Sequence, residues 1–256
     1  MIQVEGLTKL YGKFVAVDDL SFAVQPGEVL GLVGPNGAGK TSTLRCLSGI
    51  IPPSRGVIRV SGIDLAVDPI SAKKQIAFFN DEPRLFEYLT VEQHLAFTAR
   101  IYQVDQYESI ATHLLQELEL ADKRDALPGE LSRGMKQKLA IACGLLHSPK
   151  VIYFDEPLTG LDPIGIRRMK ASIIQRAKEG AAVILSSHLL HLVGEICSHI
   201  LILKNGRKVI HGTIAEIVRT FSTGVEDPDL EEVFIRATNE SSDKPPIVYD
   251  PGATTR

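Results

Sequence analysis

The chain has 256 residues, of which 44% are hydrophobic, and a formal net charge of −3 at pH 7. This length suits one large α/β domain or two small ones, and the hydrophobic fraction excludes a chain that is disordered throughout. The near-neutral charge gives no electrostatic footprint for nucleic acid as the main ligand.

Cysteine content and hydropathy suggest a chain without a membrane anchor of its own. Cys46, Cys143 and Cys197 lie far apart and match no metal-ligand spacing, so we interpret them as free thiols in a reducing cytosol. The N-terminus lacks a basic region followed by an apolar stretch, so no signal peptide is predicted. No run approaches the roughly 18 apolar residues that span a bilayer. We therefore expect no transmembrane segment, and any membrane association must go through a partner.

The first part of the chain predicts a pair of strands. Residues Ile2–Tyr11 and Phe14–Val24 alternate in hydrophobicity around a turn at Gly12-Lys13. Tyr11 lies at the end of the first strand. Its ring either stacks on an adenine base or packs at the core or its rim, and position alone does not decide between the two.

A glycine-rich loop follows the next strand. Residues 34–41 read Gly-Pro-Asn-Gly-Ala-Gly-Lys-Thr, after an apolar run at 29–33 and before a helix-like segment from Lys40 to Leu47. An ordinary turn is the alternative, but strand, glycine-rich loop and helix in this order are typical of a phosphate-binding loop. The glycines let successive N–H groups point at an anion, and the helix N-terminus adds partial positive charge.

Two side chains of this loop have predicted roles in the chemistry. Lys40 would reach the β- and γ-phosphates, as a catalytic as well as a binding residue, and the Thr41 hydroxyl would ligate Mg²⁺. The residues predicted to bind the nucleotide are Gly34, Pro35, Asn36, Gly37, Ala38, Gly39, Lys40, Thr41 and Ser42.

The middle of the chain changes from strands to helices. Strands are predicted at Val57–Val60 and Ile76–Phe79, and apolar residues then repeat at helical spacing from Thr90, which has a capping-box pattern, to Leu127. We expect a helical subdomain over about residues 84–148. Ser132 is placed as the N-cap of its last helix, and Ser and Gly at such a helix start can also form a second anion site.

Two carboxylates end the next strand. Val151–Phe154 is a continuous apolar run, typical of a parallel strand that is buried on both faces, and Asp155-Glu156 follows it. A solvated strand end is the alternative, but ligands of open α/β sheets bind at the carboxyl ends of strands. We expect Asp155 to hold Mg²⁺, directly or through water, and Glu156 to polarise an attacking water.

The last third of the chain contributes one more candidate residue. The buried strand Val183–Leu185 leads to His188, which falls at the same sheet edge and is placed to sense or hydrogen-bond a γ-phosphate. Residues 200–211 predict a hairpin with a primed Asn-Gly turn. Asp229–Ala237 predicts a short amphipathic segment, and the composition of 239–256 predicts a disordered tail.

These motifs resemble the nucleotide-binding subunit of an ABC transporter, over nearly the whole chain from Ile2 to about Thr238. A phosphate loop alone fits many NTPase families. A signature motif between it and a Walker B motif, followed by a D-loop and a histidine, is highly specific. The matching segments are residues 34–41 (Walker A), 131–137 (signature motif), 151–156 (Walker B with the catalytic Glu), Leu161-Asp162 (D-loop), His188 (switch histidine) and Tyr11 (adenine-stacking aromatic).

The resemblance implies a fold and a domain plan. The fold is α/β: a P-loop NTPase core, with a mostly parallel sheet flanked by helices, an N-terminal antiparallel β subdomain and an α-helical insertion subdomain. One ABC ATPase domain would cover residues 1–238, with the helical subdomain at about 84–148 and a C-terminal segment at about 222–238.

The resemblance also implies a dimer in which ATP lies at the interface. Two domains would pair head to tail, each ATP between one Walker A motif and the partner's signature motif. Ser132 and the Gly134 N–H would contact the γ-phosphate bound by the opposite subunit, and Asp162 would communicate between the two sites. A triphosphate needs donors on all sides, which neither half supplies alone.

The chain departs from the family pattern at two places. Arg133 and Met135 replace the commoner Gly and Gln of the signature motif, but Ser132 and Gly134 remain, so we expect a working site. Asp81 stands where the Q-loop Gln is usual. As an anionic side chain it either ligates Mg²⁺ through water or weakens coupling, and Glu82 is the neighbouring candidate if the register shifts by one.

The expected function is an ATP- and Mg²⁺-dependent ATPase that powers a separate membrane permease from the cytoplasmic face of the membrane. The segment Asp229–Phe234 resembles the C-terminal part of exporter ATPases, which favours export. A homodimer is the simpler assembly because one chain carries all the motifs. Alternatives are a soluble ABC-type ATPase that acts on the ribosome or DNA, and a subunit that binds ATP without hydrolysing it. No direct binding of nucleic acid is expected.

Overall fold

Two sheets organise the chain in a computed structural model, which describes residues 1–80, 82–158, 163–222 and 228–240. The N-terminal sheet is antiparallel, in the order β2-β1-β4-β5, and its strands are β1 (Ile2–Tyr11), β2 (Phe14–Val24), β4 (Arg55–Val60) and β5 (Ile63–Asp64). The central sheet has the order β10-β9-β3-β8-β7-β6. It is parallel except for its edge strand β10, and its strands are β3 (Val29–Val33), β6 (Ile76–Phe79), β7 (Val151–Asp155), β8 (Ala182–Ser186), β9 (His199–Lys204) and β10 (Arg207–Thr213).

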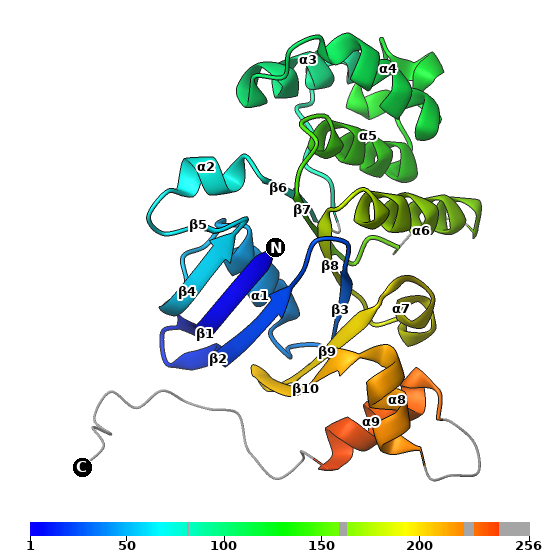
Figure 1. Ribbon diagram of the computed structural model, residues 1–256. Coiled ribbons are helices and arrows are strands. Elements are labelled where there is room, and N and C mark those ends of the chain that lie inside the picture. Colours follow the sequence, from blue (N-terminus) through cyan, green and yellow to red (C-terminus); the bar gives the residue numbers. More distant parts are fainter. Residues whose placement is uncertain (81, 159–162, 223–227, 241–256) are drawn as a thin grey trace.

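The helices cover both sides of the central sheet and form a separate layer beyond it. Figure 1 shows α1 beside the N-terminal sheet, a layer of α3, α4 and α5 in green at the far end of the molecule, and α8 and α9 near the β9–β10 hairpin. The α-helices are α1 (Lys40–Leu47), α2 (Pro69–Lys73), α3 (Val91–Tyr102), α4 (Tyr107–Glu117), α5 (Arg133–Leu145), α6 (Pro163–Lys178), α7 (Leu190–Ile196), α8 (Ile214–Phe221) and α9 (Leu230–Glu240). The expected α/β core with its antiparallel and helical subdomains is confirmed.

Strand β7 shows why an unbroken apolar run is needed in this sheet. Successive side chains of a strand point to opposite faces. Val151 and Tyr153 therefore belong to the core between the two sheets, whereas Ile152 and Phe154 belong to the core beneath the helices. Because both faces are covered, all five residues of the strand are buried, and the charged Asp155 sits at its carboxyl end.

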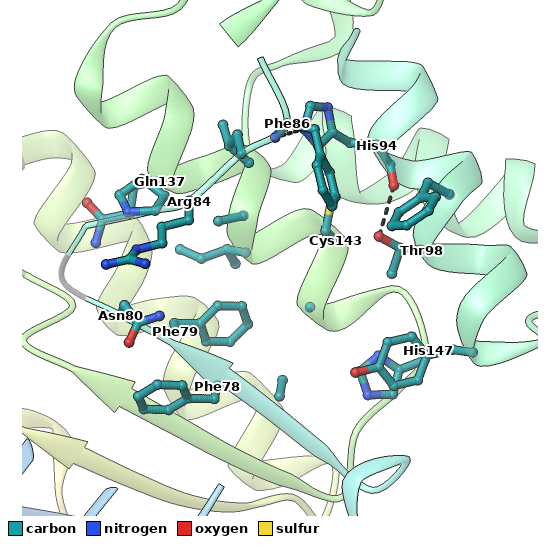
Figure 2. A pocket seen from close by; sticks show the side chains of 18 of the residues that line it. Phe78, Phe79, Asn80, Arg84, Phe86, His94, Thr98, Gln137, Cys143 and His147 are labelled. Carbon is teal, nitrogen blue, oxygen red and sulfur yellow. Dashed lines mark hydrogen bonds between the residues drawn. The ribbon is translucent and has the colours of Figure 1, made fainter. Parts of the chain in front are cut away.

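The helical layer is joined closely to the central sheet through α5 (Figure 2). A Cβ at Gly144 would lie 2.3 Å from the Phe79 ring, so this close approach of α5 to β6 requires glycine. Nearby, the rings of Tyr102 and His147 stack with centroids 3.8 Å apart, and His147 Nε2 lies 3.2 Å from the carbonyl oxygen of Ile76. Burial lowers the pKa of His147, which favours the neutral ring in this contact.

Local signals in the helical layer act as the sequence predicts. Thr90 caps α3 in a capping box with Gln93, and Ser132 Oγ accepts a hydrogen bond from the Met135 N–H at the start of α5.

The three cysteines are free, as expected, and burial raises the pKa of Cys46 and Cys143 to about 11.

The C-terminal part packs beside the phosphate loop. The β9–β10 hairpin turns at Asn205-Gly206, both with positive φ, which confirms the primed turn. The Gly206 N–H donates to the Ala38 carbonyl oxygen at 3.1 Å, so the hairpin supports the loop directly. The predicted amphipathic segment forms α9, which continues to Glu240, and the rest of the predicted tail, 241–256, lies outside the described residues.

Candidate active site

The phosphate loop depends on glycines for both its path and its contacts. Gly37 and Gly39 have φ of 78° and 103°, a left-handed conformation that side chains rarely adopt. A Cβ at Gly34 would lie 2.4 Å from the Leu203 carbonyl oxygen, and one at Gly39 would lie 2.4 Å from that of Ala16. Gly39 is also the N-cap of α1, so the loop delivers its N–H groups to the positive end of a helix.

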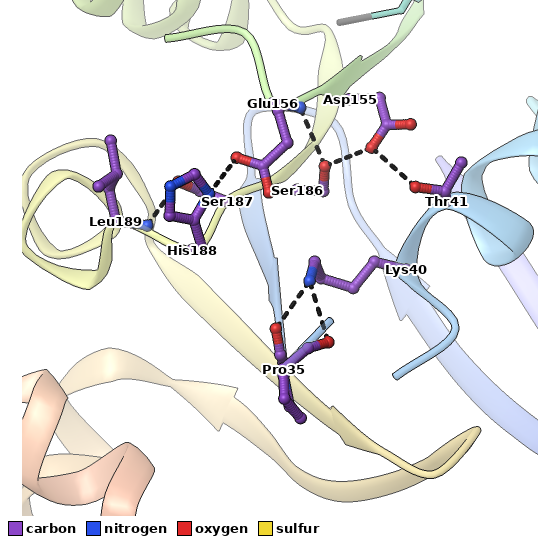
Figure 3. Close-up of polar contacts among 10 residues, drawn as sticks. Pro35, Lys40, Thr41, Asp155, Glu156, Ser186, Ser187, His188 and Leu189 are labelled. Carbon is purple, nitrogen blue, oxygen red and sulfur yellow. Dashed lines mark hydrogen bonds and ion pairs between the residues drawn. The ribbon is translucent and has the colours of Figure 1, made fainter. Parts of the chain in front are cut away.

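Lys40 is held in the centre of this loop. Its side chain is buried, and Nζ donates to the carbonyl oxygens of Gly34 at 2.7 Å and Pro35 at 3.3 Å (Figure 3). Burial lowers the pKa of Lys40, and the carboxylates of Glu156 and Asp155 oppose that shift. The ammonium group thus lies among backbone acceptors and two acids, where a polyanion would be its strongest partner.

Asp155 joins the carboxyl end of β7 to the start of α1. Its Oδ1 accepts a hydrogen bond from Ser186 Oγ at 2.7 Å and lies 3.4 Å from Thr41 Oγ1. Asp155 is only 8% exposed, so these hydroxyls offset part of the cost of burying its charge. Thr41 and Asp155 together offer the hard oxygen donors that Mg²⁺ prefers.

Ser186 is a site residue that the sequence reasoning missed. It is the residue opposite Asp155 in the parallel register of β7 and β8, and its Oγ also accepts a hydrogen bond from the Glu156 N–H at 3.0 Å. A hydroxyl residue at the end of the neighbouring strand is the signal that would have identified it. Ser186 therefore ties both acids to β8.

Glu156 and His188 form a pair across the ends of β7 and β8 (Figure 3). Glu156 Oε2 lies 2.9 Å from His188 Nδ1, and the Glu156 backbone has a φ of 53°, unusual for a residue with a side chain. Figure 3 shows the Glu156 side chain turned toward His188, whereas that of Asp155 points to Thr41. The Asp155 carboxylate therefore lies beside the phosphate loop, and the Glu156 carboxylate is oriented by the His188 imidazole.

Comparison with known protein families agrees with this geometry. The family model described as ABC transporter matches residues 17–159, more than half of the chain. The chain belongs to this family.

Individual relatives of this ABC protein match most of its length. The ABC-type transporter ATP-binding protein EcsA of Bacillus subtilis is 33% identical over 94% of this chain and 98% of its own. The bacitracin transport ATP-binding protein BcrA of Bacillus licheniformis is 36% identical over 81% of this chain and 68% of its own. The resemblance found in the sequence is thus confirmed, and the chain is an ABC-type ATPase.

Solved structures support the same fold. The structure of an ATP binding subunit of an ABC transporter matches with a TM-score of 0.88 and 34% identity, over 93% of this chain and 99% of that one. The dimeric ATP-binding cassette MJ0796 bound to ADP and Pi matches with a TM-score of 0.75 at 23% identity, over 84% and 99%, and so shares the fold.

The signature residues of the ABC ATPase lie apart from the cluster around Lys40. Ser132 is exposed at the start of α5, in the helical layer, and a Cβ at Gly134 would meet no atom within 4 Å. Buried Gln137 of the same helix donates to the Pro157 carbonyl oxygen at 3.0 Å, immediately after Glu156. The helical layer is therefore in contact with the chain just after β7, although Ser132 itself lies apart from the cluster around Lys40.

Three further predictions have different outcomes. Tyr11 is 46% exposed and carries the Lys9 ammonium 5.2 Å from its ring centroid, so it is not a core residue and adenine stacking stays a prediction. Asp81 and the D-loop pair Leu161-Asp162 lie outside the described residues. Within the described part of the chain, no helix combines the length and apolar character needed to cross a membrane.

Proposed function

We propose that this ABC ATPase dimerises around two ATP molecules and powers export through a separate permease, at the cytoplasmic face of the membrane. The observation that carries the proposal is the Glu156–His188 pair at 2.9 Å, beside a loop that holds Lys40, Thr41 and Asp155. Residues 34–39 would bind the phosphates and Glu156 would act as base at the same sheet edge, which together meet what hydrolysis of a triphosphate requires.

The residues divide the work as follows. The backbone N–H groups of Asn36, Gly37 and Gly39 and the N-terminus of α1 bind the phosphates, and Lys40 contributes a charge at the β- and γ-positions. Thr41 and Asp155 have the oxygen donors to hold Mg²⁺, as does the predicted ligand Asp81, and the metal would neutralise charge on the phosphate oxygens. Glu156 accepts a proton from the attacking water, and His188 orients that carboxylate from Nδ1.

The dimer is supported by what one copy leaves incomplete. Ser132 and Gly134 are accessible at the start of α5, yet their own phosphate loop lies elsewhere. In a head-to-tail pair each signature motif would complete the partner's site, with Asp162 between the two sites. Because one chain carries every motif, we infer a homodimer.

The permease is expected to dock at an exposed apolar patch formed by Phe86 and Phe97, which are 56% and 41% exposed, with Ile101 one helical turn beyond Phe97 on α3. Phe86 and Phe97 contact each other edge to face at 5.1 Å, over a cavity of about 290 Å³ between β6, α3 and α5 (Figure 2). Large exposed apolar side chains gathered beside a hollow are typical of a protein interface. A short cytoplasmic segment of the permease is the occupant we infer.

Export is the direction favoured by relatives. BcrA is named for bacitracin transport, and the B. subtilis protein SkfE, 34% identical over 81% of this chain and 87% of its own, for peptide export. The C-terminal segment that resembles exporter ATPases forms α9. These points support export without naming the substrate, which the permease would select.

The proposal predicts a stoichiometric membrane partner. Tagged Glu156→Gln protein, incubated with ATP and detergent-solubilised membranes of the native host, should retain a polytopic membrane protein identifiable by mass spectrometry. The matched control is the same protein with Phe86→Asp and Phe97→Asp, which should lose that partner while still binding ATP. Recovery of ribosomes or DNA-bound proteins instead would contradict the transporter function.

A further inference from the structure

The C-terminal helix α9 packs on the helix that begins directly after His188. Helix α7 starts at Leu190, and a Cβ at Gly194 on α7 would lie 3.1 Å from Leu230 of α9. Val233 is fully buried, so α9 is part of the main core rather than a loose appendage. Figure 1 shows α9, in orange-red, next to α8 and below α7.

One polar contact caps the start of α9, and two others join the helix to neighbouring elements. At its start, Asp229 accepts a hydrogen bond from the Glu232 N–H at 2.8 Å. In its middle, Arg236 donates to the Phe221 carbonyl oxygen at 2.9 Å. Near its end, Lys204 of β9 donates to the Thr238 carbonyl oxygen. The helix therefore has a defined position relative to the hairpin that supports the phosphate loop.

A cavity of about 310 Å³ lies between the phosphate loop and the histidine segment. Among the described residues, its lining comes from residues 33–36 and from 187, 188 and 190, with one exception, Phe234 of α9. Phe234 thus borders the same cavity as the start of the phosphate loop and the segment that contains His188.

The histidine segment is tied to β3 by one long backbone bond, from the N–H of buried Ser187 to the Leu32 carbonyl oxygen at 3.4 Å. His188 has a side chain that is 56% exposed, and the Leu189 N–H bonds locally to Ser187 Oγ at 3.0 Å. Beyond that bond the segment depends on the burial of Leu190, which is 8% exposed and lines the cavity together with Phe234.

We propose that Phe234 is a positioning residue for hydrolysis: its ring keeps the His188 segment at a set distance from the phosphate loop, so that His188 meets Glu156. The inference rests on the role of His188 proposed above. It assigns the C-terminal helix a function in catalysis, because a small displacement of an orienting group can lower turnover strongly without altering the binding of substrate.

The test uses the full chain and steady-state ATP hydrolysis. Phe234→Ala should lower kcat about tenfold or more, with the KM for ATP changed by less than about twofold. Hydrogen exchange of the Leu189 amide should become faster in this variant. Phe234→Leu, which restores apolar volume, should recover most of the turnover, and Ile235→Ala, which removes an exposed side chain of the same helix, should behave as wild type.

Double mutants separate this inference from the site assignment. In a His188→Ala background, Phe234→Ala should cause no further loss, because both changes act on one orienting group. Wild-type kcat in Phe234→Ala, or an equal further loss in the His188→Ala background, would overturn the inference. Wild-type turnover in His188→Ala alone would instead refute the proposed role of His188.

Discussion

Glu156→Gln should lower kcat for ATP hydrolysis by about 10²- to 10⁴-fold, the range over which positioned general bases act. The amide has nearly the same shape as the carboxylate but cannot accept the proton of the attacking water. The fold should be unaffected, because the backbone N–H of residue 156, not its side chain, bonds to Ser186 Oγ. Lys40, Thr41 and Asp155 are unchanged, so the affinity for ATP should remain.

Steady-state phosphate release and equilibrium nucleotide binding check this prediction together. The matched control is Glu108→Gln, which makes the same change at an exposed position of α4 and should turn over ATP as wild type does. Undiminished turnover in Glu156→Gln would refute its assignment as the base.

Lys40→Ala should weaken ATP binding by about 10- to 100-fold, because each hydrogen bond to a charged group contributes about 1.5–3 kcal/mol and about 1.4 kcal/mol is a factor of ten. The loss concerns the β- and γ-phosphates, so binding of AMP should change little. The variant also loses the Lys40 bonds to the Gly34 and Pro35 carbonyl oxygens, but the close approach of Gly34 to Leu203 and the Gly206 N–H bond to Ala38 remain to hold the path of the loop.

Titration calorimetry with ATP and with AMP measures both effects. Lys150→Ala is the matched control, because Lys150 is exposed at the amino end of β7, opposite the edge where Asp155 lies. Unchanged ATP affinity in Lys40→Ala would refute the interpretation of residues 34–41 as a phosphate-binding loop.

Local patterns explain which parts of the site were predictable. The strand, loop and helix around Lys40, and the acids that end β7, are each contained within a short stretch of chain, so motif and spacing are sufficient. The same holds for the Thr90 and Ser132 caps and for the Asn205-Gly206 turn.

Contacts between distant segments were not predictable in this way. Ser186 joins the site only because parallel pairing sets it opposite Asp155, 31 positions earlier in the chain. The bond from Gln137 to the Pro157 carbonyl oxygen depends on how α5 packs on the sheet. Phe234 reaches the cavity beside His188 through packing of α9 on α7, which no periodicity within α9 encodes.

The roles of Asp81 and Asp162 stay predictions because both residues lie outside the described part of the chain. The role of Tyr11 stays a prediction because it concerns a nucleotide rather than a contact within the chain. For Tyr11 the structure shows an exposed ring at the end of β1, which leaves it accessible to a base. The contribution of Tyr11 therefore concerns the affinity for the nucleotide, not the stability of the fold.

The central claim is that two copies of this chain close around ATP, and the mass of Glu156→Gln in solution tests it most directly. Light scattering during size-exclusion chromatography should give a dimer with ATP and a monomer of 27.9 kDa with ADP. Adding Ser132→Arg to Glu156→Gln places a large side chain at the exposed signature motif. This double mutant should remain monomeric with ATP and bind ATP with the same affinity as Glu156→Gln alone. A monomer of Glu156→Gln at saturating ATP would contradict the account.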